Sequence, residues 1–510
     1  MFPSLSAYRK DKGGFSLPKT IPIFYSALLL TLVNLLLRFV GTSFQVYLSS
    51  RIGAAGIGLL QLVMSVGGLS MVAGMGGIRT ATMYLTAEEL GRKHPQNVIW
   101  VLSGCFLYSI CFSGCVAAAL YHFAPQIASI WIGDPRTVDA LRLFASFLPV
   151  TCLCGVMTGY FTAANRIGTL AAGEVAEQVC SMGLTLGALT LFAGHDPVRS
   201  TMCVILGSSG GCVLTLVCLV ILRLREHAPT GSRIPVGSRL AQTALPLAIA
   251  DDLKSGISTI ENLMVPKRLA QNRTVASPLA AFGLVSGMVF PVIMFPAAIL
   301  FGLTELLVPE LARCAASGSK TRIHYLVRTA LRVALVYGAL TGGLLCLLSD
   351  QLCLSLYHSL DASKQMRAYA LLVPMLYCDI VTDAMTKGLG QQKICVRYNI
   401  FTSILDILFL YILLPHYGMG GYWVSFTVTH LINFILSLQR LLKITVKRIP
   451  AHIPILSAAA ILFSVWSASF VPNALMRCCA YILLLSSLFV LLGILRKADI
   501  HWAKGLIYAK

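Results

Sequence analysis

The stretch IPIFYSALLLTLVNLLLRFVGTSFQVYL, residues Ile21–Leu48, decides the fold class. It exceeds the roughly 20 predominantly apolar residues that a membrane-spanning helix needs, and its single charged residue is Arg38. An ionisable residue inside a membrane segment is costly and usually has a function. We therefore predict a membrane helix that carries one arginine near its middle.

The same pattern continues along the chain. Of the 510 residues, 57% are hydrophobic and 12% are charged, about half the charged fraction of a soluble protein. Apolar stretches of about 20 residues recur and leave no space for a sizeable soluble domain. We predict an all-α polytopic membrane protein with about 14 transmembrane helices. They are expected near 21–49, 56–86, 97–120, 139–164, 168–193, 200–222, 240–265, 279–308, 325–348, 366–389, 394–414, 418–439, 451–470 and 474–495.

The net charge of +20 indicates orientation in a membrane rather than affinity for nucleic acid. If the N-terminus is inside, Lys and Arg concentrate in the connections that face the cytoplasm, as the positive-inside rule describes. We therefore expect both termini to be cytoplasmic. The 16 cysteines are scattered and form no C-x-x-C pair, so we expect no metal site and no cofactor. Nothing in the sequence requires an oligomer.

An internal repeat divides the chain. GLLQLVMSVGGLSMVAGMGG (Gly58–Gly77) matches GLVSGMVFPVIMFPAAILFG (Gly283–Gly302) at an offset of 225 residues, and the same offset aligns later helices without a gap. Six helices fit within it, so both copies enter the membrane in the same direction. We predict an N-terminal lobe at 1–225 with helices 1–6, a C-terminal lobe at 226–445 with helices 7–12, and two extra helices at 446–510. Such paired lobes usually enclose a transport site.

Arg38 belongs to a polar stripe on the first helix. Asn34, Arg38 and Gln45 share one helical face with two threonines, and such a stripe must face protein or a water-filled cavity. We interpret these three residues as substrate-binding residues of a central cavity. The alternative is that Arg38 forms an ion pair with Asp251 or Glu261 that only fastens the helices.

The second helix and the seventh carry further charges. Arg79 follows several glycines in the second helix; we assign it to the cavity, although it could instead extend toward the inner headgroups. In the seventh helix, Lys254 and Glu261 are also assigned to the cavity. A coupling-ion site or an ion pair between helices is expected for a further set: Asp251, Asp252 and Glu177. Single carboxylates such as Asp406 are interpreted as polar contacts between helices.

Three stretches resemble a known family. LLLRFVGTSFQVYLSSRIGAAGIGLLQLVMSVGGLSMVAGMGGIRTATMYLTAEELGRK (Leu35–Lys93) resembles the opening of the stage V sporulation protein B group of polysaccharide flippases. GYFTAANRIGTLAAGEVAEQ (Gly159–Gln178) and ENLMVPKRLAQ (Glu261–Gln271) are similar to later segments of that group. The group lies in the multidrug/oligosaccharidyl-lipid/polysaccharide (MOP) exporter superfamily, with the lipid II flippase MurJ among its relatives.

The resemblance implies a flippase of the bacterial cytoplasmic membrane. Its substrate would be an undecaprenyl-(pyro)phosphate-linked sugar or cell-wall precursor, moved by alternating access of two lobes, with Arg38 as a cavity arginine. A guanidinium can replace phosphate hydration with bidentate hydrogen bonds. No G-x-x-x-x-G-K-[ST] motif is present, so energy would come from membrane potential, an ion gradient or downstream consumption of the substrate.

Two other readings remain at this point. A cation-coupled multidrug exporter of the same superfamily is the main alternative, and it would need a cavity dominated by carboxylates. A membrane-embedded glycosyltransferase or ligase is disfavoured, because such enzymes usually carry paired carboxylates on a large outer loop. The longest outer connection expected here is short, so we do not expect an enzyme.

Overall fold

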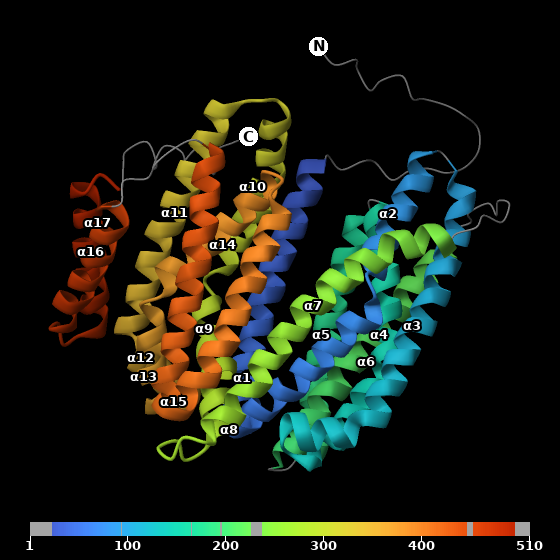
Figure 1. The fold of residues 1–510 in the computed structure, drawn as a ribbon, viewed down its shortest axis with the longest axis horizontal. Helices are drawn as coiled ribbons and strands as arrows, with labels where there is room; N and C mark the ends of the chain where they lie inside the picture. The colour runs from blue at the N-terminus through green and yellow to red at the C-terminus, as the bar shows by residue number, and fades with distance from the viewer. Residues whose placement is uncertain are drawn as a thin grey trace.

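The computed structural model describes residues 23–92, 94–164, 166–193, 196–225, 237–445 and 452–494. Throughout these ranges the regular structure is helical and no β-strand occurs. The all-α prediction is therefore confirmed. Figure 1 shows the helices standing side by side in two groups, with the last two helices packed at one edge.

The first group is built from the helices before residue 225, although the first half of α1 stands beside the second group (Figure 1). Their bounds are α1 (Ile23–Met75), α2 (Ile78–Gly91), η2 (Pro95–Asn97), α3 (Val98–Gln126), η3 (Ile127–Ile132), η4 (Pro135–Thr137), α4 (Val138–Ala163), α5 (Ile167–Ala188), η5 (Leu189–Ala193) and α6 (Pro197–Leu224). We call this group the N-terminal lobe.

The second group, the C-terminal lobe, follows. Its bounds are α7 (Gly237–Leu269), α8 (Pro278–Gly283), η6 (Leu284–Val289), α9 (Phe290–Met294), α10 (Ala298–Ala316), α11 (Lys320–Leu347), α12 (Ser349–Tyr357), α13 (Leu360–Ala370), α14 (Val373–Gly388) and α15 (Gln392–Thr445). The edge helices are α16 (His452–Ser469) and α17 (Ala474–Leu491). The predicted lobe boundaries adjoin residues outside the described ranges and stay predictions.

Helices occupy the described part of every predicted segment, but their breaks differ from expectation. Gly53 (φ 79°) interrupts α1 and Gly418 (φ 55°) interrupts α15, so each long helix is two antiparallel segments. The expected helix 279–308 is broken by a 60° bend before α10, and the expected helix 366–389 by a 55° bend between α13 and α14. Prolines at or beside these bends remove backbone donors and explain them.

The number of membrane crossings stays a prediction. Within the described ranges, eight helices are long and apolar enough to cross a membrane, or up to ten if each bent pair counts as one span. In that count α1 and α15 are each one helix although a glycine divides each into two segments, and α7 is left out because it carries several charges. The chain is nevertheless a multi-pass helical membrane protein, as predicted.

The offset of 225 residues recurs in the structure. The helix ends at Gly91 and Ala316 are this far apart, and so are the helix ends at Ala163 and Gly388. Gly133 and His358 share the offset as well, and both adopt positive φ at the turn that follows the helix. The repeated helix ends and turns support two copies of one architecture that run in the same direction.

The two lobes are joined at one end of the bundle. We call the end at which α1 begins the inner end and the opposite end the outer end (Figure 1). At the outer end one apolar core includes Leu62 and Leu141 of the N-terminal lobe with Phe282 and Leu414 of the C-terminal lobe. This shared core closes the outer end.

Glycines allow this closure. A Cβ on Gly283 would lie 2.0 Å from the Ala54 carbonyl oxygen, and a Cβ on Gly58 would lie 2.3 Å from that of Leu279. Only residues without a side chain permit such close backbone contact. We call the contact of Ala54 and Gly58 with Leu279 and Gly283 the outer seal.

Candidate functional site

Arg38 lies in the first half of α1 and reaches toward the C-terminal lobe. Its guanidinium carbon lies 4.3 Å from the centre of the Phe301 ring, in the first turn of α10. The side chain is exposed, and no carboxylate of the described residues lies within salt-bridge distance of it. The alternative ion pair with Asp251 or Glu261 is therefore not formed in this structure.

The neighbours of Arg38 fasten the first half of α1 to the same lobe. The rings of Phe39 and Phe295 are 5.2 Å apart, and the Ser49 hydroxyl donates a hydrogen bond to the Gly287 carbonyl at 3.0 Å. Gln45 is half-buried, and its Nε2 has no hydrogen-bond partner among the described residues. The side chain of Asn34 lies outside the described residues. Arg38 is thus a residue of the lobe interface.

The helix that carries Phe301 is held in a broken shape. The break between α9 and α10 contains Pro296, and the Tyr337 hydroxyl donates to the Pro296 carbonyl at 2.8 Å. The Tyr377 hydroxyl donates to the Ile293 carbonyl at 2.9 Å. These bonds tie two backbone carbonyls at the break to α11 and α14; the Pro296 carbonyl also accepts the Ile299 backbone N–H at 3.3 Å. They therefore hold the start of α10 in place, and with it the Phe301 ring that contacts Arg38.

Arg79 lies at a different place, inside the N-terminal lobe. It is exposed and begins α2 just after the Gly76–Gly77 break. Its backbone packs against α4, because a Cβ on Gly159 would lie 2.5 Å from the Arg79 carbonyl oxygen. Its charge acts on Glu174 of α5, which in turn neighbours Glu177. The structure describes no contact between Arg79 and Arg38.

The middle of α7 packs against the second half of α1. Thr259 donates to the Ser65 carbonyl at 3.1 Å, and Asn262 donates to the Ser65 hydroxyl at 3.0 Å. Nearer the inner end, Asp251 and Lys254 are exposed. Asp252 is half-buried, and its buried Oδ1 has no partner among the described residues. The charged residues of α7 therefore face several surroundings rather than one cavity wall.

Glu261 faces the C-terminal lobe. Its carboxylate interacts with the Ser403 hydroxyl and with the charge of Asp406, both on α15. Asp406 Oδ1 also accepts hydrogen bonds from Ser425 at 2.6 Å and from Thr429 at 3.2 Å, beyond the kink of α15. The Asp406 carboxylate thus links both halves of α15 through two hydroxyls, and the Glu261 charge on α7 acts on it. We call these five residues the carboxylate cluster.

The carboxylate cluster was not predicted as a site. Asp406 was interpreted as a polar contact between helices, and its bonds to Ser425 confirm such a contact. Its approach to Glu261 was missed, because the residues are far apart in sequence and no motif links them. Among the described residues, no three His, Cys, Asp or Glu side chains gather as a metal site would require.

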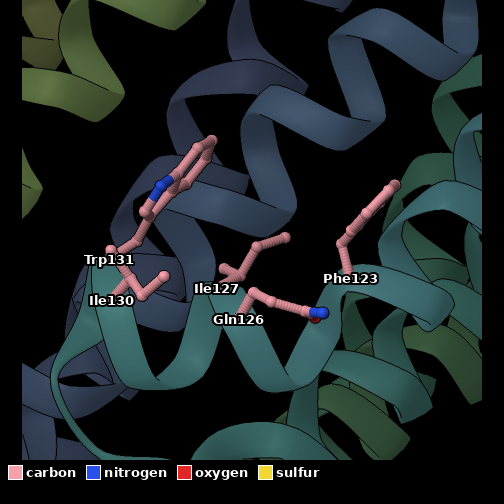
Figure 2. A pocket seen from close by; sticks show the side chains of 5 residues that line it. All are labelled: Phe123, Gln126, Ile127, Ile130 and Trp131. Atoms are coloured by element: carbon pink, nitrogen blue, oxygen red, sulfur yellow. The ribbon is translucent and has the colours of Figure 1, made fainter.

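A pocket lies at the outer end of the N-terminal lobe, away from Arg38. Its volume is about 260 Å³. Figure 2 shows its lining on the end of α3 and on η3: Phe123, Gln126, Ile127, Ile130 and Trp131. Four of these five side chains are apolar, and none belongs to the predicted site. The pocket therefore adds no group to the chemistry at Arg38.

Comparison with known proteins places this geometry in a family. The MatE family model matches residues 28–185 and 246–412. Stage V sporulation protein B of Bacillus subtilis (strain 168) is 20% identical over 405 residues, covering 77% of this chain and 78% of that protein.

Solved structures share the fold. Lipid II flippase MurJ in an inward closed conformation gives a TM-score of 0.66 at 13% identity, covering 91% of this chain and 98% of that one. An inward-facing multidrug resistance MATE family transporter of the MOP superfamily gives 0.65 at 12% identity, covering 81% and 98%. An outward-facing one gives 0.59 at 14% identity, covering 82% and 96%.

The family match covers more than half of the chain, and the resemblance drawn from Leu35–Lys93 points to the same relatives. The curated relative is a stage V sporulation protein, and the solved structures include a lipid II flippase and a multidrug resistance transporter. The chain belongs to the MatE family, and its long apolar helices are those of a multi-pass membrane protein.

Proposed function

We propose that this protein is a flippase for an undecaprenyl-(pyro)phosphate-linked sugar or cell-wall precursor in the bacterial cytoplasmic membrane. The observation that carries the proposal is the state of Arg38. It is a cation within a membrane-spanning helix, exposed at the lobe interface, with an aromatic ring and no described carboxylate beside it. A guanidinium without an anionic partner is suited to a phosphate, which it binds with two parallel hydrogen bonds.

The proposed mechanism is alternating access. The shared core closes the outer end in this conformation, so a head group would enter from the inner end. Rocking of the lobes would then open the outer seal and release the head group to the other leaflet, while the lipid tail stays in the bilayer. This scheme requires both termini in the cytoplasm and needs one copy of the chain.

The carboxylate cluster is the proposed place of energy coupling. Glu261 belongs to α7 and Asp406 to α15, so binding of a cation or proton between them would change how these helices attract each other. Asp251, Asp252 and Glu177 were the expected coupling residues. The cluster now adds Glu261 and Asp406 as stronger candidates, because hydroxyl groups surround them.

A cation-coupled multidrug exporter of the same superfamily is the second candidate. One feature favours it: the charges of Glu261 and Asp406 act on each other in the carboxylate cluster. Several of the solved structures that share the fold are MATE transporters. Under this alternative the substrate would be an organic cation, and Arg38 would repel it rather than bind it.

The test separates the two candidates. The purified full-length chain is reconstituted into vesicles that contain a fluorescent undecaprenyl-pyrophosphate-linked sugar, and a membrane-impermeant sugar-processing enzyme reports the exposed head groups. Faster exposure than in protein-free vesicles supports the flippase. Transport of an organic cation such as ethidium, without any gain in head-group exposure, would establish the exporter instead.

A further inference from the structure

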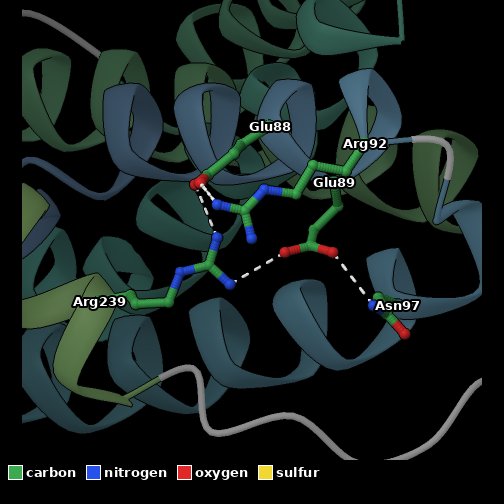
Figure 3. A network of polar contacts seen from close by, with 5 residues as sticks. All are labelled: Glu88, Glu89, Arg92, Asn97 and Arg239. Atoms are coloured by element: carbon green, nitrogen blue, oxygen red, sulfur yellow. Dashed lines mark hydrogen bonds and ion pairs between the residues drawn. The ribbon is translucent and has the colours of Figure 1, made fainter.

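An ionic network at the inner end joins the lobes. Arg239, in the first turn of α7, lies between two adjacent glutamates at the end of α2 (Figure 3). Its Nη2 is 2.6 Å from a carboxylate oxygen of Glu88, and its Nη1 is 2.9 Å from one of Glu89. We call these three residues the inner clamp.

The inner clamp is supported and partly shielded from water. Asn97 donates to the other oxygen of Glu89 at 3.1 Å, and Glu89 is only 3% exposed. Arg92 approaches Glu88 at 2.5 Å but is the residue that directly follows α2, four positions along the chain. A shielded charge pair is more costly to break than a surface pair, because the remaining charge is left without a partner. The inner clamp is therefore a strong attachment, whereas the Arg92 pair links no two helices.

The inner clamp fastens α7, which was grouped with the C-terminal lobe, to α2 of the N-terminal lobe. Leu240 and Ala244 of α7 are buried in the core of the N-terminal lobe beside Ile78 and Val98. The later half of α7 still contacts α1 through Thr259 and Asn262, and it also reaches α15 beside Glu261. Figure 1 shows α7 changing direction along its length as it passes from one lobe to the other. A helix held by both lobes must change its bend when the lobes move.

We propose that the inner clamp is a conformational latch that stabilises the state in which the outer seal is closed. Arg239 holds the first half of α7 on the N-terminal lobe. The position of this half determines how far α7 bends, and the bend seen here accompanies a closed outer end. An interaction made in only one of two conformations shifts the equilibrium toward that conformation. Loss of the inner clamp therefore loosens the outer seal at the opposite end of the bundle.

The inference rests on the proposed rocking of the lobes but on no particular substrate, so its test involves no transport. Hydrogen–deuterium exchange is measured by mass spectrometry on the full-length protein in lipid nanodiscs. The variants are Arg239→Gln and Arg239→Lys. The matched control is Arg92→Gln, which removes a cation from the same network but leaves the link between α7 and α2.

Arg239→Gln should accelerate exchange in two places: the start of α7 and the outer-seal segments 54–58 and 279–287. The expected factor at the seal is roughly tenfold, as for the loss of one hydrogen bond to a charged group. Arg239→Lys keeps the charge but loses the two-branched fork, so it should give a smaller acceleration. Arg92→Gln should leave the outer seal unchanged.

Two results of the exchange measurement would overturn the proposal. Faster exchange confined to the start of α7, with an unchanged outer seal, would show that the clamp only fastens a helix end and would overturn the proposal. If Arg239→Gln does not fold because Glu89 is left buried and unpaired, Arg239→Lys decides alone. An unchanged seal in a folded Arg239→Lys protein whose α7 start exchanges faster would also overturn it.

Discussion

Gly58 and Gly283 are 225 residues apart in the chain and lie in direct backbone contact: a Cβ on Gly283 would be 2.5 Å from the amide nitrogen of Gly58. They are also equivalent positions of the internal repeat. A residue that touches its own repeat equivalent must lie at the axis that relates the copies. The predicted axis that relates the two lobes therefore passes through the outer seal.

The first prediction concerns this contact. Gly283→Ala places a methyl group 2.0 Å from the Ala54 carbonyl oxygen, so the backbones must separate. Overpacking of this kind costs about 1–3 kcal/mol, and we expect faster amide exchange in 54–58 and 279–287. Gly68→Ala is the matched control, because a Cβ there meets nothing within 4 Å. Equal exchange in both variants would contradict a tight seal.

Much of the fold was predictable because it depends on local patterns. Long apolar stretches located the helices, and the 225-residue offset anticipated the shared turn at Gly133 and His358. The places where a helix bends inside an apolar stretch were harder to predict from the sequence. The bend before α10 lies at Pro296, but Pro149 lies inside the unbroken α4. A proline signals a possible break, and tertiary packing decides whether the helix bends.

The second prediction concerns the turn at the outer end between η3 and η4. Asp134 caps η4 by accepting the Arg136 backbone N–H at 3.0 Å, and its side chain also pairs with the Arg136 guanidinium. The hydrogen bond from the Arg136 side chain lowers the pKa of the Asp134 carboxyl below its ordinary value. This stabilisation is complete above the unfolded pKa of about 3.9 and is lost as the pH falls through the lower folded pKa.

Asp134→Ala should therefore reduce the free energy of unfolding by about 1 kcal/mol at pH 7, the usual cost of losing such a cap. The difference from the unmodified protein should shrink as the pH approaches 3. Thermal unfolding of the detergent-solubilised protein at a series of pH values measures both quantities. A difference that stays constant with pH would show that the Asp134 charge contributes nothing.

The third prediction concerns the carboxylate cluster. Glu261→Gln and Asp406→Asn keep the shape and remove the charge, so we expect transport to lose its dependence on an imposed pH or sodium gradient. Head-group exposure is compared in vesicles with and without each gradient. Asp361→Asn is the control, because that carboxylate is exposed and pairs with the exposed Lys364. A gradient response that survives in both cluster variants would remove the cluster from energy coupling.

The candidate site was harder to predict than the fold. The stripe on α1 singled out Arg38, since an arginine in an apolar helix is conspicuous. Its partner Phe301 was not foreseeable, because a phenylalanine in an apolar stretch carries no signal of its own. The contacts of Asp406 with Ser425 and Thr429 depend on the kink at Gly418, which folds α15 back on itself. Contacts created by such folding leave no spacing pattern in the sequence.

The last prediction tests Arg38 itself. Arg38→Lys keeps a cation above the Phe301 ring but removes the guanidinium fork, and Arg38→Ala removes both. A hydrogen bond to a charged group is worth about 1.5–3 kcal/mol. We therefore expect Arg38→Lys to slow head-group exposure roughly tenfold or more, and Arg38→Ala to abolish it. Both variants should reach normal abundance, because Arg38 has no described carboxylate partner that its loss would leave unpaired.

The two roles of Arg38 give different results in the same experiment. If the arginine only fastens α1 to α10, Phe301→Leu should reduce the folded amount as much as Arg38→Ala does, because each removes one side of the contact. If it binds phosphate, Phe301→Leu should retain part of the transport, since the guanidinium remains while its support is lost. Unchanged exposure in Arg38→Ala, at normal abundance, would show that the arginine is not the phosphate contact. The lipid-linked substrate would then have to be recognised elsewhere, and Arg79 would be the next arginine to test.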